Sequence, residues 1–117
     1  MTSAWLLLAT VAPLIVGCSD PCGNEISQSL RSPSGTFDAV VFSRNCGATT
    51  GFNTQVSVVR AGEKLPTDGG NVFIANGTLP ISVKWETDTR LRIGGIGGAS
   101  PLKKEAKVSN VEVSYAL

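Results

Sequence analysis

The chain has 117 residues, with 10 basic and 9 acidic side chains, no histidine and a formal net charge of +1. This balance argues against a nucleic-acid-binding surface, which needs a basic stripe, and the missing histidine removes the commonest general base. We therefore expect no enzymatic activity, no cofactor, no metal site and no nucleic-acid partner. The length allows one small domain rather than two.

An uncharged apolar segment covers residues 4–17 and runs into Leu-Ile-Val-Gly-Cys at residues 14–18. It is shorter than the roughly 20 apolar residues of a membrane-spanning helix, and it fits the apolar region of a secretory signal. The motif at its end resembles the lipobox of bacterial lipoproteins. The resemblance implies that residues 1–17 are a signal peptide, that cleavage follows Gly17, and that Cys18 becomes the lipidated N-terminus.

Two other interpretations of this segment stay open: a buried apolar stretch with a chance cysteine, and a short anchor that is not cleaved. Polar Ser19, Asp20 and Pro21 follow at once, which favours the signal peptide. Residues 2–4 carry no lysine or arginine, so the signal is atypical or its start lies upstream. By the sorting rule of Gram-negative lipoproteins, Ser19 implies the outer membrane, facing the periplasm. Residues 18–23 would then form the lipidated N-terminus and tether, and residues 24–117 one β domain.

The start of this domain predicts a β-hairpin. Residues 26–31 alternate in polarity, residues 36–43 are rich in Phe and Val, and the Ser-Pro-Ser-Gly between them is typical of a turn. A three-residue loop at this turn would place Ile26 opposite Phe42 and Gln28 opposite Val40.

The three cysteines of the chain fit the same register. If Cys18 takes the lipid, Cys22 and Cys46 are left as a pair, and export makes a disulfide between them the expected state. The register of the predicted hairpin places Cys22 directly opposite Cys46, at a separation that suits a disulfide. The hairpin and the disulfide therefore support each other.

The rest of the chain also has the pattern of β-strands. Further strands are predicted at residues 54–60, 71–75, 81–86 and 111–115. A tight loop at residues 87–89 would pair Trp85 with Leu91 and Val83 with Ile93. Residues 102–108 are ambiguous, and we favour a strand there. Because no segment has a sustained helical period, we expect an all-β fold, a small antiparallel β-sandwich or barrel of about seven strands with one disulfide.

The polar loop from Cys46 to Asn53, with the two residues before it, is the candidate binding site. The disulfide would anchor its start, and its candidate residues are Arg44, Asn45, Thr49, Thr50 and Asn53. The alternative is a structural connection whose side chains satisfy its own backbone. The pattern Cys-Gly-Asn-Glu from residue 22, followed by Cys-Gly-Ala-Thr-Thr-Gly-Phe from residue 46, resembles a family of small exported bacterial proteins. The resemblance implies export but no particular activity.

Three other features have a functional and a structural interpretation. Residues 94–98 are glycine-rich but lack the ending of a P-loop, so a flexible connection is favoured over a phosphate site. The basic cluster of Lys103, Lys104 and Lys107 favours a solvated strand edge over a binding patch. The carboxylates of Asp38, Glu86 and Glu112 would suit a small hydrolase if the fold brought them together.

These features predict a lipoprotein of the cell envelope with a non-catalytic binding or scaffolding domain. Its expected partners are the membrane, through the lipid on Cys18, and a protein of the envelope. The first alternative is an inhibitor of a hydrolase such as a cell-wall lytic enzyme, since small lipid-anchored β-barrel lysozyme inhibitors have a suitable architecture. The second alternative is a small hydrolase.

Overall fold

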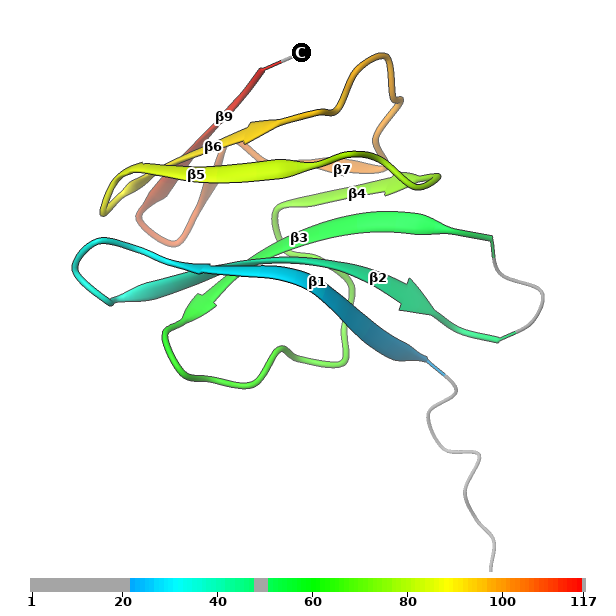
Figure 1. Ribbon diagram of the computed structural model, residues 1–117, viewed down its shortest axis with the longest axis horizontal. Coiled ribbons are helices and arrows are strands. Elements are labelled where there is room, and N and C mark those ends of the chain that lie inside the picture. The colour runs from blue at the N-terminus through cyan, green and yellow to red at the C-terminus, as the bar shows by residue number, and fades with distance from the viewer. Residues whose placement is uncertain (1–21, 48–50, 117) are drawn as a thin grey trace, which may run out of the picture.

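The computed structural model describes residues 22–47 and 51–116, which form nine β-strands (Figure 1). The predicted all-β fold is confirmed, and no helix occurs in the described residues. The strands are β1 (Gly23–Arg31), β2 (Phe37–Asn45), β3 (Asn53–Arg60), β4 (Phe73–Asn76), β5 (Ser82–Thr87), β6 (Arg90–Gly94), β7 (Lys103–Lys104), β8 (Lys107–Val108) and β9 (Val111–Tyr115). The ambiguous segment 102–108 forms two short strands rather than one, which is one reason why the structure has more strands than predicted.

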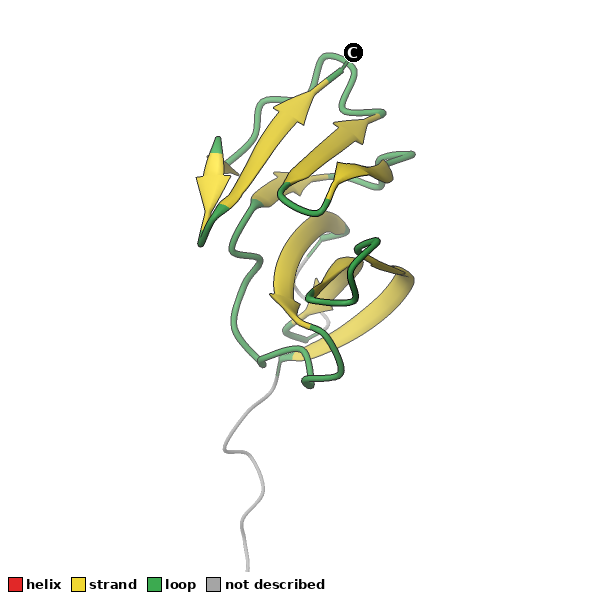
Figure 2. Cartoon of the chain, turned by 90° about the vertical axis from the view of Figure 1, so that its left-hand side faces the viewer, coloured by secondary structure: helices red, strands yellow, loops and turns green. Residues whose placement is uncertain are grey.

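The strands form two sheets that pack face to face as a sandwich (Figure 2). One sheet has five strands in the order β1-β2-β3-β4-β7, and the other has four in the order β5-β6-β9-β8. Alternate residues of β2 to β6 and β9 point between the sheets and form the core, in which Val56, Phe73, Leu91, Ile93 and Val111 are fully buried. The core residues lie between Ala39 and Val113, so the chain from Cys22 onward carries its own core.

The β1–β2 hairpin has the predicted register at its open end. Ile26 lies opposite Phe42 and Gly23 lies opposite Asn45. One step further, Cys22 and Cys46 are joined by a disulfide. The predicted disulfide is therefore confirmed.

Nearer the turn the predicted pairing of Gln28 with Val40 is wrong. Gln28 lies opposite Val41, because Ser27 forms a β-bulge and donates its hydroxyl to the Val41 carbonyl (3.2 Å). The loop also contains one residue more than predicted, since the Ser32 amide donates to the Phe37 carbonyl (2.8 Å). The longer loop and the bulge each shift the register by one residue in opposite senses, so the predicted register returns before the disulfide.

The β5–β6 hairpin has the two predicted pairs, Val83 with Ile93 and Trp85 with Leu91. Its loop is shorter than predicted, because Thr87 pairs with Arg90 and a bulge follows Trp85. The hairpin alternates buried and exposed positions in both strands, as the polarity pattern predicted.

Strand β9 pairs with β6 in parallel, the one parallel ladder among the described strands. A parallel pair requires a long crossover, and residues 95–110 supply it through β7 at the edge of one sheet and β8 at the edge of the other. The Glu105 amide donates to the Val72 carbonyl (2.8 Å) and the Val113 amide to the Ala106 carbonyl (2.9 Å). The crossover thereby closes one long side of the sandwich.

The opposite long side, between β1 and β5, is joined mainly by side chains. The indole Nε1 of Trp85 donates to the Leu30 carbonyl (2.8 Å), and Nε2 of Gln28 donates to the Ile81 carbonyl (2.9 Å). Strand β1 is therefore an edge strand whose residues are nearly all exposed. Its position depends on the β2 ladder, on these side-chain bonds and on the disulfide.

The outer face of the five-stranded sheet is covered by the β3–β4 connection, residues 61–72, which runs beneath β1 to β3 in Figure 1. The Gly70 amide donates to Oε1 of Gln55 (2.7 Å). The Asn71 side chain accepts from the Val58 amide and donates to the Val58 carbonyl (both 2.9 Å). This cover explains why β2 and β3 are buried on both faces.

Candidate functional site

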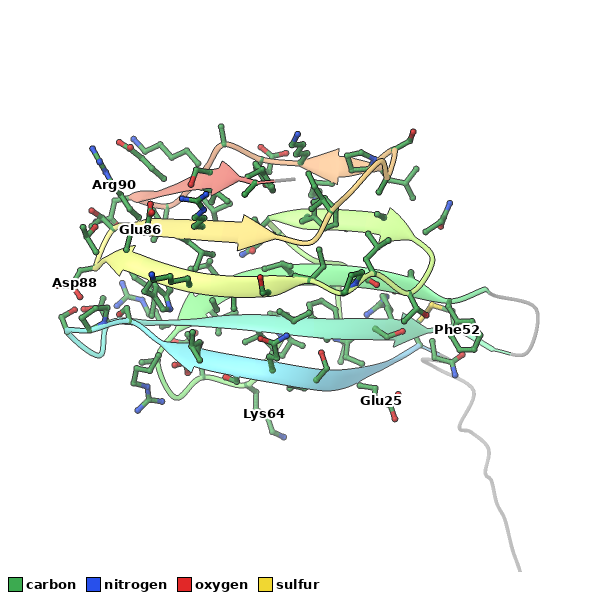
Figure 3. The ribbon with its side chains drawn as sticks, turned by 45° about the horizontal axis from the view of Figure 1, so that its top comes forward. Glu25, Phe52, Lys64, Glu86, Asp88 and Arg90 are labelled. Carbon is green, nitrogen blue, oxygen red and sulfur yellow. A yellow bond between two sulfur atoms is a disulfide. The ribbon has the colours of Figure 1, made fainter. Side chains whose placement is uncertain are left out.

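The disulfide marks one end of the sandwich, at which β1 and β3 begin and β2 ends. We call it the disulfide end; it also carries the exposed side chain of Phe52 (Figure 3). Three of the predicted binding-loop residues, Arg44, Asn45 and Asn53, lie there. Thr49 and Thr50 lie outside the described residues, as does Cys18.

Asn53 continues the pairing of β2 with β3 two residues beyond the last ladder pair, Phe42 with Gln55. Its Oδ1 accepts from the Arg44 amide (2.8 Å), and its Nδ2 donates to the Arg44 carbonyl (2.5 Å). The same Oδ1 accepts from Nε2 of Gln55 (3.1 Å). The side-chain amide of Asn53 therefore replaces a backbone pair where the strands diverge, which is a structural role.

The other two predicted residues also bond within the protein. Nη1 of Arg44 donates to Oδ1 of Asn24 (3.1 Å), and Nδ2 of Asn24 donates to the Pro66 carbonyl (2.9 Å). Oδ1 of Asn45 accepts from the Gly47 amide (3.0 Å). The described loop residues thus tie the disulfide end together, and a role for them in binding stays a prediction.

Phe52 is the residue of this end that sequence reasoning missed. Its side chain is 79% exposed, the largest exposure of any bulky apolar side chain in the described part of the chain. It borders two adjoining hollows of about 290 and 270 Å³, which it shares with Glu25 and Ser43. Its one sequence signal is an aromatic residue next to Gly51 in an otherwise polar loop.

The glycine-rich stretch also lies at the disulfide end, and it is anchored rather than loose. Gly95 has φ +85°, and a Cβ at this position would collide with the Pro80 carbonyl oxygen. Ile96 next to it is buried in the core. The stretch therefore closes the end of the core, and the close approach to Pro80 explains why a glycine occupies position 95.

A second surface, which we call the charged face, is the outer face of the four-stranded sheet. Alternation along β5, up to the bulge after Trp85, and along β6 and β9 buries one set of residues and exposes the other. The exposed set, with Lys107 of β8, consists of Ser82, Lys84, Glu86, Arg90, Arg92, Lys107, Glu112 and Ser114. Part of this face is hollowed by about 500 Å³, a volume bordered by Glu86, Arg90, Lys107 and Glu112.

The charges on this face are loosely paired. Nε of Arg90 lies 3.8 Å from Oε1 of Glu112, and Nη1 of Arg92 lies 3.7 Å from Oε2 of Glu86. Lys84 and Lys107 form no ion pair with any other described residue. Four basic and two acidic side chains give the charged face a net charge of +2, although the whole chain carries only +1.

Of the three carboxylates considered together from sequence, two converge. Glu86 and Glu112 border the same hollow, whereas Asp38 lies on the other sheet. Asp38 accepts from Nε and Nη2 of Arg31 (3.0 and 3.3 Å) and from the Gly62 amide (3.1 Å). The hydrogen bond from Arg31 lowers the pKa of Asp38, against the opposing effect of burial, so this carboxylate is a structural anchor.

Tyr115, near the end of β9, bonds to the crossover. Its hydroxyl donates to the Glu105 carbonyl (2.6 Å), and Nζ of Lys104 lies 4.9 Å from the centre of its ring. Burial, with the negative charge of Glu105, raises the pKa of Tyr115 to about 12. The three clustered lysines lie in β7 and β8, at sheet edges, as the structural interpretation predicted.

No protein-family model, curated protein or solved structure matches this chain. Within residues 22–47 and 51–116 there is no helix long and apolar enough to cross a membrane. The same residues contain no group of three or more metal-binding side chains.

Proposed function

We propose that this chain is a lipid-anchored protein of the bacterial cell envelope whose β domain binds a partner without catalysing a reaction. The observation that carries the proposal is the disulfide between Cys22 and Cys46, which begins four residues after the lipobox cysteine. Structural disulfides persist in oxidising compartments such as the periplasm. The disulfide and the lipobox are separate features, and both support export to the cell envelope.

The lipid on Cys18 would supply the attachment. A single acyl chain gives only marginal membrane binding, whereas two or more chains hold a protein stably. A lipoprotein cysteine carries at least two. With Ser19 next to the lipidated cysteine, we place the protein in the outer membrane, facing the periplasm.

The charged face is the surface best suited to a partner. Its side chains are exposed, its ion pairs are long, and two of its lysines have no acidic partner among the described residues. Its excess of basic groups favours a partner with an acidic surface. Glu86 and Glu112 lie beside arginines in water-exposed positions, whereas a catalytic acid is usually held in an apolar pocket, so the arrangement supports binding rather than catalysis.

The attachment is tested by labelling cells with radioactive palmitate. The full chain should incorporate the label and a Cys18→Ala variant should not. Label that persists in the variant would contradict the proposed lipid site.

The binding role is tested with the soluble domain, residues 19–117, as bait in an envelope extract. A partner of the charged face should be captured by the unaltered domain but not by a Lys84→Glu, Lys107→Glu variant. A Lys64→Glu variant, which reverses one charge, is the control for each single reversal, because Lys64 lies on the opposite side of the molecule (Figure 3). A captured hydrolase that the domain slows would identify the binding role as inhibition. Hydrolysis by the domain itself, lost in Glu112→Gln, would overturn the non-catalytic assignment.

A further inference from the structure

The geometry points to a fixed side of the domain that meets the membrane: the disulfide end docks on the lipid surface, and Phe52 inserts between the head groups. This inference rests on the proposed lipid on Cys18, because the lipid brings this end of the domain to the bilayer. Its contacts are nevertheless those of the domain itself, and they can be tested separately.

The reach of the tether sets the orientation. Cys22 is held to Cys46 by the disulfide, and the β1–β2 ladder begins at the next residue. The four residues from Cys18 to Cys22 span at most about 14 Å. Strands β1 and β2, of nine residues each, are about 30 Å long. The disulfide end is therefore kept within a short distance of the bilayer, while the opposite end can extend away from it.

Phe52 is placed to use this proximity. Its side chain is 79% exposed, yet its carbonyl accepts from the Gly77 amide (2.9 Å), and Asn53 beside it is bonded to Arg44. In solution an exposed phenylalanine keeps its apolar surface in contact with water, which is unfavourable. Burying that surface at an apolar boundary removes this cost. Phenylalanine and leucine are also typical of the membrane-facing side of interfacial segments.

A second exposed apolar side chain lies at the same end. Leu102 is 71% exposed, and its amide donates to the Ile74 carbonyl in β4 (2.7 Å). Strand β4 runs toward the disulfide end, since Asn76 at its end pairs with Asn53. Lys103 follows Leu102 directly, and a lysine near the surface of an anionic bilayer is attracted to its head groups. The disulfide end thus combines these two apolar side chains with the basic groups of Lys103 and Arg44, and one carboxylate, that of Glu25, borders the hollows at Phe52.

Docking at this end leaves the charged face free. The strands of the four-stranded sheet run between the two ends of the sandwich, so their outer face stands along the side of the domain rather than against the bilayer (Figure 1). The membrane contact and the proposed partner contact therefore use different surfaces.

The test attaches the domain to vesicles independently of any cellular lipidation. Residues 18–117 with the disulfide intact have one free thiol, on Cys18, which couples to a maleimide-bearing phospholipid in vesicles of mixed neutral and anionic lipid. The one tryptophan in this fragment, Trp85, is buried and gives a constant background. A Phe52→Trp variant reports on the disulfide end, and Thr89→Trp, in the exposed β5–β6 turn at the opposite end, is the matched control.

Apolar side chains of interfacial segments lie about 5–10 Å into the boundary between head groups and acyl chains. Lipids brominated in the upper part of the acyl chain quench a tryptophan that reaches this depth. We expect the added emission of Phe52→Trp to be lost on brominated vesicles and that of Thr89→Trp to be retained. Equal quenching of the two variants, or none in either, would overturn the docking inference. Leu102→Trp is the second reporter if Phe52→Trp does not fold, and it should also be quenched.

The two proposals fail in different ways. If palmitate is not incorporated in cells but Phe52→Trp is quenched on coupled vesicles, the lipid site is wrong and the docking surface stands. If Cys18 is labelled in cells but neither reporter at the disulfide end is quenched, the lipid site stands and the docking surface is wrong. A Phe52→Ser variant provides a further measure, because losing this side chain should lower the ratio of docked to undocked domain by about tenfold or more.

Discussion

Replacing both Cys22 and Cys46 by serine should lower the free energy of unfolding by about 3.5 kcal/mol, the loop-closure entropy of a 25-residue ring. The structure gives this disulfide particular weight because it holds the first residues of β1, an edge strand that is exposed along nearly its whole length. The ladder between β1 and β2 still holds β1 once the covalent bond is gone, so removing the cross-link acts mainly on the unfolded chain. The loss should therefore be close to the full entropic value.

The assay is urea unfolding of residues 19–117, which lack the third cysteine. With a slope of about 1.5 kcal/mol per molar urea, the midpoint of the double variant should lie roughly 2 M below that of the oxidised domain. The reduced unaltered domain is the control and should unfold at the same urea concentration as the double variant. If the midpoint moves by less than about 0.5 M, the disulfide does not lower the conformational entropy of the unfolded chain by the amount expected for this loop length.

Three further predictions concern single residues. Tyr115, the only tyrosine of the chain, should ionise near pH 12 rather than near 10 when its absorbance is titrated. Because its pKa is raised in the folded state, the contribution of Tyr115 to stability is complete below about pH 10 and is lost as the pH rises toward 12. The pKa of Asp38 is lowered in the folded state, so its bonds to Arg31 and the Gly62 amide stabilise the domain fully above about pH 4 and less as the pH falls through the folded pKa. In Asp38→Asn the unfolding midpoint should therefore fall less steeply as the pH is lowered. The same dependence of the midpoint on pH in both proteins would contradict this role. Gly95→Ala should lower the free energy of unfolding by roughly 2–4 kcal/mol in thermal or urea unfolding, because the added Cβ meets the Pro80 carbonyl. Gly97→Ala, also at positive φ but with open space around it, is the control and should lower it by only about 1 kcal/mol. Equal losses in the two variants would refute the clash.

The candidate site was less predictable than the fold. Polar side chains near glycines and a disulfide suit a binding loop, which is why the sequence favours Arg44, Asn45 and Asn53. In the structure Arg44 and Asn53 bond β1, β2 and β3 together at the disulfide end, and Asn45 accepts from the Gly47 amide. Whether a polar side chain faces a ligand or its own backbone depends on the path of the neighbouring strands, which local pattern does not contain. Phe52 was missed for the same reason, since its exposure depends on where β3 and the Gly77 turn leave it.

Local pattern in the sequence predicts the all-β class, the longer strands, the positions of the main turns and the partner of Cys22. These features follow from period-two polarity, turn residues and the arithmetic of a hairpin, all of which act over short distances along the chain. The tertiary structure decided the parallel pairing of β9 with β6, the cover over the outer face of β2 and β3, and the meeting of Glu86 with Glu112 but not with Asp38. Each of these depends on contacts between distant segments, and the bulge at Ser27 shows how one unpaired residue, with no mark in the sequence, shifts the register of a strand.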